Sequence, residues 1–201
     1  MINKKALLMV AAALVTALIL SSLAVMRTAR SQDEMPAATL MLLQIDGMLG
    51  ESTVADHEHW IDIDAFAWSE AMKSLTSAAS GRAAGKLNMT AFQFAMKTNK
   101  ASVMLFLACA TGRIIPQARF DVCKPATEAG PVMLLRFDFV GVTIASYSIA
   151  GNAQDYHTDD EFSIAFSKIT MTYWQYDIEG NLVGDFGAYY DLIAGKGDIE
   201  L

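Results

Sequence analysis

The chain has 201 residues, of which 53% are hydrophobic, and a formal charge of −7. Residues 1–30 contain four basic residues and no acid, so the remainder has 11 basic against 22 acidic residues, a charge of −11. This balance argues against a nucleic-acid-binding protein, which needs basic patches to neutralise phosphate, and against attachment of the folded domain to anionic lipid.

Residues 1–30 form a separate segment, which we interpret as a signal peptide or a signal anchor. A basic start is followed by Ala6–Val25, where only Thr16, Ser21 and Ser22 interrupt the apolar residues. About 20 residues at about 1.5 Å each just span a bilayer core of about 30 Å. Two outcomes are open, cleavage after Ala24 or retention as an anchor. Retention would be the only membrane attachment that we expect.

A short polar stretch at residues 31–39, containing Pro36, is expected to link this segment to one domain over residues 40–201. Initiation at Met26 or Met35 would remove the apolar segment altogether. About 160 residues are enough to bury roughly two-thirds of the unfolded surface.

Period-two alternation of apolar and polar residues predicts a mainly β domain of antiparallel strands. Strands are expected at residues 40–45, 61–65, 92–97, 133–139, 162–166, 169–173 and 189–192, the last being the closing strand. A shift near Ser167 indicates a β-bulge, and Glu179–Asn181 indicates a hairpin turn. Leu40–Leu43 is apolar on both faces, which indicates burial between subunits or under a helix. The small and polar residues 73–84 are expected to form a long loop, either functional or mobile.

One short helix is expected within residues 98–112. Asn99 or Ser102 is suited to cap its start, the run Val103–Thr111 is apolar, and Gly112 supplies the left-handed residue that ends helices. Pro116 biases Ile115 away from helix, so an extended segment follows. Cys109 and Cys123 are expected to be small buried hydrophobic residues, with one disulfide as the alternative.

Side chains suited to chemistry are sparse. His57 and His59 would share one face of a strand and bind a metal ion, or would lie in a solvated turn before Trp60. The acidic residues 157–161 lack calcium-loop spacing and are expected to be a solvated loop. No triad, Walker loop or dinucleotide motif occurs. We therefore expect no enzyme, no catalytic or metal site and no cofactor. Trp60, Trp68 and Trp174 are expected in the core or at an interface rather than on a ligand-stacking surface.

An ordered set of short motifs resembles the haemolysin-coregulated protein family, Hcp, over roughly residues 40–192. These motifs are Leu43–Ser52; Ile61–Ile63 with Ala67–Ser69; Gly85–Lys86 before Phe92–Phe94; Leu107–Cys109 with Gly112; Pro116–Ala118; and Gly187 with Tyr190–Asp191. The resemblance implies an antiparallel β-barrel of two sheets with one flanking helix. It also implies ring-shaped homohexamers that stack into the tube of a type VI secretion system.

Through the same resemblance, the partners would be other copies of the chain, a VgrG-type spike, a contractile sheath and small effector cargo. The loop at residues 73–84 would help neighbouring subunits contact each other. Tube subunits assemble in the cytoplasm, whereas residues 1–30 predict a secreted or periplasmic protein, or one anchored in the inner membrane with its barrel outside the cytoplasm. The alternative function is therefore an exported or membrane-tethered binding module that does not form the tube.

Overall fold

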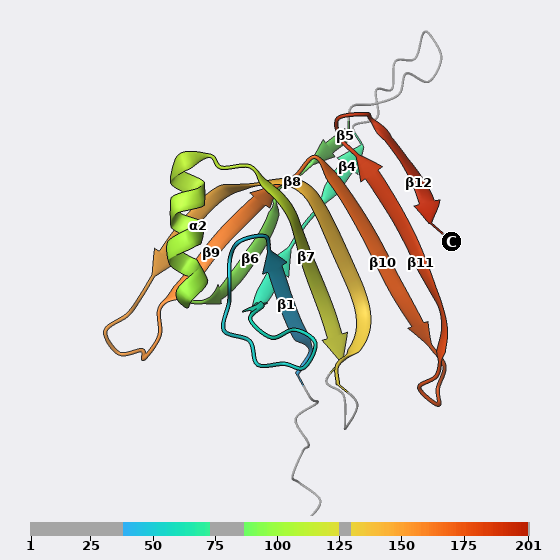
Figure 1. The fold of residues 1–201 in the computed structure, drawn as a ribbon, viewed down its shortest axis with the longest axis horizontal. Helices are drawn as coiled ribbons and strands as arrows, with labels where there is room; N and C mark the ends of the chain where they lie inside the picture. Colours follow the sequence, from blue (N-terminus) through green and yellow to red (C-terminus); the bar gives the residue numbers. More distant parts are fainter. Residues whose placement is uncertain (1–37, 73–86, 125–129, 201) are drawn as a thin grey trace, which may run out of the picture. The chain divides into compact units, whose positions relative to one another are not determined.

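Antiparallel strands dominate the fold, as the alternation predicted (Figure 1). The computed structural model of the chain describes residues 38–72, 87–124 and 130–200. The elements are β1 (Leu40–Ile45), β2 (Ile61–Asp62), β3 (Ala65–Ala67), β4 (Glu70–Met72), β5 (Leu87–Met89), β6 (Phe92–Lys97), α2 (Lys100–Thr111), β7 (Ile115–Lys124), β8 (Val132–Ala150), β9 (Asp159–Ala165), β10 (Lys168–Tyr176), β11 (Leu182–Asp191) and β12 (Lys196–Glu200). The predicted N-terminal segment, most of the linker and the loop at residues 73–84 lie outside the described residues.

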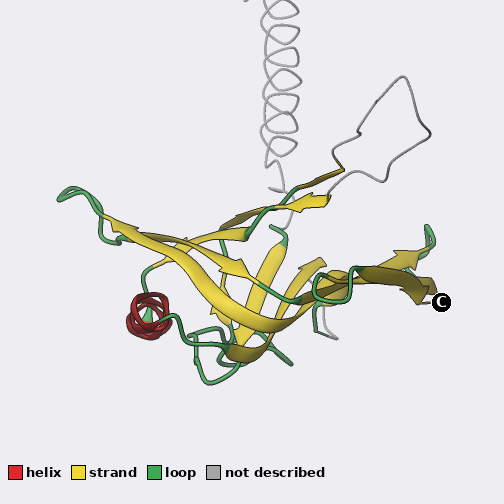
Figure 2. Cartoon of the chain, turned by 90° about the horizontal axis from the view of Figure 1, so that it is seen from above, coloured by secondary structure: helices red, strands yellow, loops and turns green. Residues whose placement is uncertain are grey.

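The strands form two sheets that share β8. The larger sheet has the order β12-β11-β10-β8-β7-β1-β2, and the second sheet has the order β3-β6-β9-β8. The 19-residue strand β8 pairs with β7 and β10 up to Val142, and with β9 from Thr143 onward. Figure 2 shows the strong bend of these strands between the sheets. β4 and β5 form a separate pair.

Aromatic side chains from both sheets fill the core between them. Phe92 of β6 lies 5.9 Å from Phe120 of β7 and 5.0 Å from Phe137 of β8, measured between ring centroids. Both contacts are edge-to-face, one of the favoured geometries for aromatic pairs. Trp68 stacks on Phe92 at 5.9 Å, so its predicted place in the core is confirmed.

A sharp corner lies where the chain passes from one sheet to the other, and the predicted β-bulge at Ser167 is wrong. Phe166 and Ser167 connect β9 in the second sheet to β10 in the larger one. Ser167 lies against Gly141 of β8, which has a φ of +63°. The loss of alternation therefore marks a change of sheet, not an extra residue within one ladder.

The helix is confirmed with both of its predicted ends. The Asn99 side chain caps α2 by accepting a hydrogen bond from the Ala101 N–H, and the Ser102 Oγ accepts one from the Asn99 N–H. Gly112 ends the helix at a φ of +61°. The predicted hairpin turn is also confirmed, because Asp177–Asn181 joins β10 to β11 with Gly180 at a φ of +89°.

The prediction that residues 189–192 form the closing strand is wrong, because β12 follows and pairs with β11. Its sequence, Lys-Gly-Asp-Ile-Glu, has one apolar side chain and no alternation, and all five residues are exposed. Only the ladder with β11 identifies it as a strand.

We expect the Gly141→Ala substitution to lower the free energy of unfolding by about 1–3 kcal/mol, since it places a side chain in left-handed backbone. The added Cβ would also lie 2.5 Å from the Ser167 Oγ. Urea denaturation measures the change. Gly184→Ala is the matched control, because nothing lies within 4 Å of its Cβ position. Equal stability of the two variants would contradict the proposed role of the corner.

Candidate functional site

A buried charged cluster lies on the face of the larger sheet that points away from the core. The Asp121 side chain on β7 is 0% exposed. It accepts hydrogen bonds from Arg136 Nε at 2.7 Å and Nη2 at 2.8 Å, and from His57 Nε2 at 2.9 Å. The carboxylate raises the pKa of Arg136 by accepting its hydrogen bonds. The cluster satisfies both carboxylate oxygens, as a buried charge requires.

His57 reaches this carboxylate because residues 50–60 fold back over the sheet. The Gly50 N–H donates to the His59 carbonyl at 2.7 Å, and the Ser52 N–H to the Trp60 carbonyl at 3.0 Å. Gly50 packs so closely that a Cβ there would lie 2.1 Å from the Trp60 oxygen. Asp56 and His59 adopt positive φ values of 65° and 67°. Non-glycine residues in this region carry strain that the surrounding contacts must offset.

The predicted strand placement of His57 and His59 is wrong, and so is the solvated-turn alternative for His57. The two lie in a turn, where His57 is buried against Asp121 and Trp60 while His59 is exposed. Within residues 38–72, 87–124 and 130–200, no three His, Cys, Asp or Glu side chains gather closely enough to hold a metal ion. Nothing in the local sequence identifies Asp121, 64 residues away, as the partner of His57.

The same arrangement explains the two apolar faces of β1. Leu42 is opposite Asp121 in the ladder, so both side chains lie on the outer face, where the segment carrying His57 packs. Leu43 points into the core. Leu42 is therefore buried by its own subunit, and the predicted burial between subunits or under a helix is wrong.

The acidic stretch at residues 157–161 is only partly solvated. Asp160 is fully buried at the start of β9, where it accepts hydrogen bonds from Thr98 Oγ1 at 2.6 Å and the Tyr147 hydroxyl at 3.0 Å. Burial, followed by this hydrogen bond, raises the pKa of Tyr147. The neighbouring Asp159 is exposed and pairs with Lys97. Only His157 and Thr158 lie in the predicted loop, because Asp159, Asp160 and Glu161 begin β9.

Both cysteines are free thiols. Cys123 is buried, as predicted, and desolvation followed by the nearby Asp121 raises the pKa of its thiol to about 11. Cys109 is half-buried on α2. The alternative prediction, a disulfide between Cys109 and Cys123, is therefore wrong.

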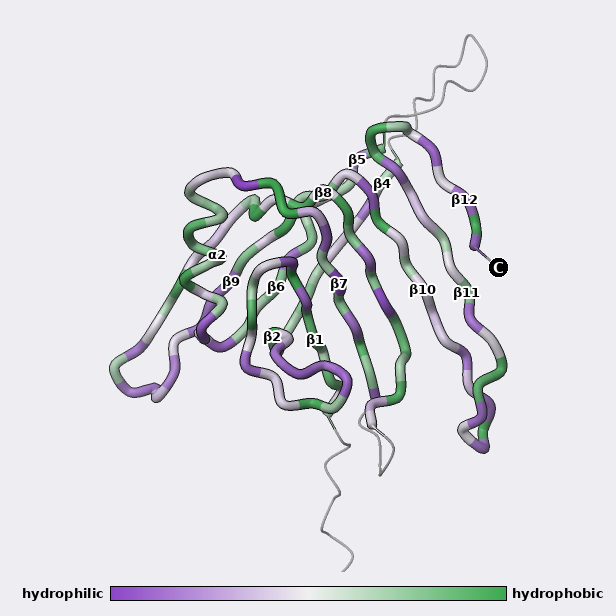
Figure 3. The backbone as a smooth tube through the Cα atoms, viewed as in Figure 1, coloured by the Kyte–Doolittle hydropathy of each residue, from purple (hydrophilic) through white to green (hydrophobic). Residues whose placement is uncertain are grey.

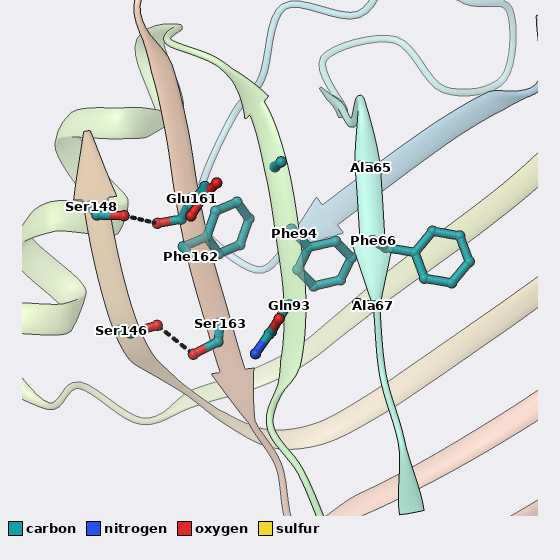
Figure 4. Close-up of a pocket in the computed structure, with 11 residues that line it drawn as sticks. Ala65, Phe66, Ala67, Gln93, Phe94, Ser146, Ser148, Glu161, Phe162 and Ser163 are labelled. Carbon is teal, nitrogen blue, oxygen red and sulfur yellow. Dashed lines mark hydrogen bonds between the residues drawn. The ribbon is translucent and has the colours of Figure 1, made fainter. Parts of the chain in front are cut away.

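A shallow hollow of about 310 Å³ lies on the outward face of the second sheet (Figure 4). The ladder places two rows of small or polar side chains there: Ala65, Ala95, Glu161 and Ser148, and Ala67, Gln93, Ser163 and Ser146. Ser146 and Ser163 hydrogen-bond each other at 2.6 Å. Among the described lining residues, Glu161 is the only ionisable side chain.

Two exposed apolar surfaces stand out among residues 38–72, 87–124 and 130–200. The first, called the β10–β12 face, continues the core-facing side of the larger sheet and comprises Met171, Tyr173, Phe186 and Ile199, which are 42–67% exposed. The second, called the α2 face, comprises Val103, Met104, Phe106 and Leu107, which are 38–72% exposed. Figure 3 shows hydrophobic colours along most of α2. Surfaces of this kind mark interaction sites.

The chain matches the family model described as "Type VI secretion system effector, Hcp" over residues 42–173. Its fold is similar to a solved type six secretion system protein, with a TM-score of 0.74 and 24% identity over 80% of this chain and 100% of the other. Hcp1 from Salmonella typhimurium gives a TM-score of 0.64 and 29% identity over 80% and 99%. A type VI secretion system effector from Yersinia pestis gives 0.61 and 28% over 75% and 98%. A comparison with curated proteins found no match.

These structures are matched over nearly their whole length. The corresponding part of this chain, the unit beginning at Ala38, is therefore expected to fold without the preceding residues.

We expect the Asp121→Asn substitution to lower the free energy of unfolding by about 3–5 kcal/mol, because it removes the charge that Arg136 and His57 share in a buried site. Asp138→Asn is the matched control on the same sheet face, where Arg119 and Asp138 are 42% and 35% exposed. That exposed pair should contribute about 0–1 kcal/mol. Chemical denaturation of both variants measures the difference, and similar losses would contradict the importance of burial.

Proposed function

The chain belongs to the Hcp family of type VI secretion system effectors, and we propose that it forms ring-shaped homohexamers that stack into a secretion tube. The observation that carries the proposal is the exposed apolar β10–β12 face. Such a surface is unfavourable in water and favours self-association. A closed ring gives every subunit the same partner on each side, so that no apolar surface remains open at an end.

The outer faces of the larger sheet and of the second sheet carry charged or polar side chains. These two faces suit contacts with other components of the apparatus. By family resemblance, the rings would contact a VgrG-type spike and a contractile sheath and carry small effectors. The hollow on the second sheet, with its alanines, serines and Glu161, is a wettable surface suited to weak contacts with different passengers. These partners are part of the proposal.

We also propose that residues 1–30 direct the chain to the inner membrane, where they are cleaved or remain as an anchor. Its support is the sequence itself, a basic start followed by Ala6–Val25. Among the described residues, no helix is long and apolar enough to cross a membrane.

For the ring proposal, we expect residues 32–201 to give a particle of six times the monomer mass in light scattering. Electron microscopy of the same fraction should show rings. A monomer at every concentration tested would contradict the proposal.

For the N-terminal segment, we expect the full chain, expressed in a cell with a functional export pathway, to enter the membrane or periplasmic fraction. Intact-mass measurement of the product then separates the alternatives: loss of residues 1–24 indicates cleavage, and the full mass indicates an anchor. A cytoplasmic product that begins at Met26 or Met35 would contradict export.

A further inference from the structure

We propose that the turn between β10 and β11 docks on a neutral lipid surface, so that the domain rests on the membrane with the end at which β1 begins. The inference rests on the proposed function insofar as residues 1–30 remain as an anchor. It adds which part of the domain faces the bilayer and what this contact means for a ring.

The chain enters the domain at the same end of the larger sheet as the β10–β11 turn (Figure 1). Leu40, the first residue of β1, is opposite Cys123, and Cys123 is opposite Met133 near the start of β8. Tyr173 of β10 is opposite the residue two places after Met133. Since β8 and β10 are antiparallel, the turn at Asp177–Asn181 projects beyond the level at which β1 begins.

The β10–β11 turn presents apolar side chains to water. Ile178 is 100% exposed, and Leu182 and Val183 at the start of β11 are 57% and 60% exposed. Asp177 fixes the turn by accepting hydrogen bonds from the Asn181 N–H at 2.7 Å and from its side-chain amide at 2.9 Å. The turn therefore holds a large aliphatic side chain outward at its tip, where burial in an apolar environment would be favourable.

The length of chain before β1 keeps this turn within reach of a bilayer that holds the anchor. Residues 31–39 span at most about 30 Å when fully extended. β1 and β10 are separated by β7 and β8, which places them about 14 Å apart at ordinary strand spacing. Because a tether raises the effective concentration of the lipid surface, a weak apolar contact is sufficient.

The charges beside the turn select the kind of lipid. Asp177, Glu179 and Asp185 are acidic, and no basic residue occurs within residues 169–195. Anionic headgroups would repel these carboxylates, whereas neutral phospholipid would admit the apolar side chains to its interface. The contact is therefore with neutral phospholipid.

The same contact gives a ring a fixed orientation. Copies related by one rotation axis place all their β10–β11 turns, and all their chain entries, at one level along that axis. All the anchors can then enter a single bilayer only if the ring axis is perpendicular to it. One face of the ring is covered by the membrane, so further rings stack only on the other face and the anchored ring is the base of the tube.

Hydrogen–deuterium exchange of the full chain in phosphatidylcholine vesicles tests the contact. The amides of residues 177–183 should exchange more slowly there than in lipid-free residues 32–201. Ile178→Glu should weaken the contact by at least about 10-fold, the effect of exposing one large aliphatic side chain, and restore fast exchange. Ile193→Glu is the matched control and should keep the protection, because Ile193 is 85% exposed in the β11–β12 turn at the opposite end of the sheet. Circular dichroism checks folding, and Val183→Glu provides a second variant.

The possible outcomes separate the inference from the proposed function. A full chain that an alkaline wash removes from the vesicles overturns the proposed anchor and the inference with it. A chain that stays in the vesicles while residues 177–183 exchange as fast as in solution overturns the inference alone. Equal protection in lipid-free residues 32–201 also overturns it, because another copy of the chain would then cover the turn. Vesicles enriched in anionic phosphatidylglycerol should protect the turn less, and stronger protection there would overturn the choice of neutral lipid.

Discussion

The constraint on which the rest of the structure depends is the passage of β8 through both sheets. A single 19-residue strand cannot remain regular while it serves two sheets, so it turns at Gly141, where Ser167 leaves no room for a side chain. The turn brings the Phe92 and Phe94 strand across from Phe120 and Phe137 and so creates the aromatic core. It also directs β10, β11 and β12 beyond the second sheet, which leaves one of their faces apolar and exposed. The core and the open surface therefore share one cause.

The Asp121 cluster determines which path residues 50–60 follow over the outer face of the larger sheet. Burying a carboxylate is unfavourable, and an ion pair with a desolvated partner need not stabilise the fold relative to an apolar substitute. The cluster instead fixes the position of residues 50–60, because His57 contacts Asp121 only when this segment follows one path across the sheet. Glu51 extends that path by accepting a hydrogen bond from the Lys100 N–H at the start of α2. One segment thus connects the outer sheet face with the helix whose far side is exposed.

A feature of the fold could be predicted from the sequence when the residues that produce it lie close together in the chain. The helix, its caps and the β10–β11 turn were found because Asn99, Gly112 and Gly180 act within a few residues of their own positions. The roles of His57, Asp121 and Asp160 were missed, since their partners are distant in sequence and carry no local signal. β12 was missed for the same reason, as its pairing with β11 replaces the alternation that a strand normally shows. The strand placement of His57 and His59 was wrong because positive φ values at Asp56 and His59 form a turn.

The acidity of the domain limits how it can associate. Subunits that each carry a net charge near −11 repel one another, and the repulsion grows with every copy added to a ring. Apolar contact must offset that repulsion, and pairing two identical acidic surfaces would add to it. The helix α2 carries Lys100 and no acid, and it is also an element with an exposed apolar side. The ladder places Asp185, Asp191, Asp198 and Glu200 on the side of β11 and β12 opposite Phe186 and Ile199. An apolar contact on the β10–β12 face can therefore form without burying these carboxylates.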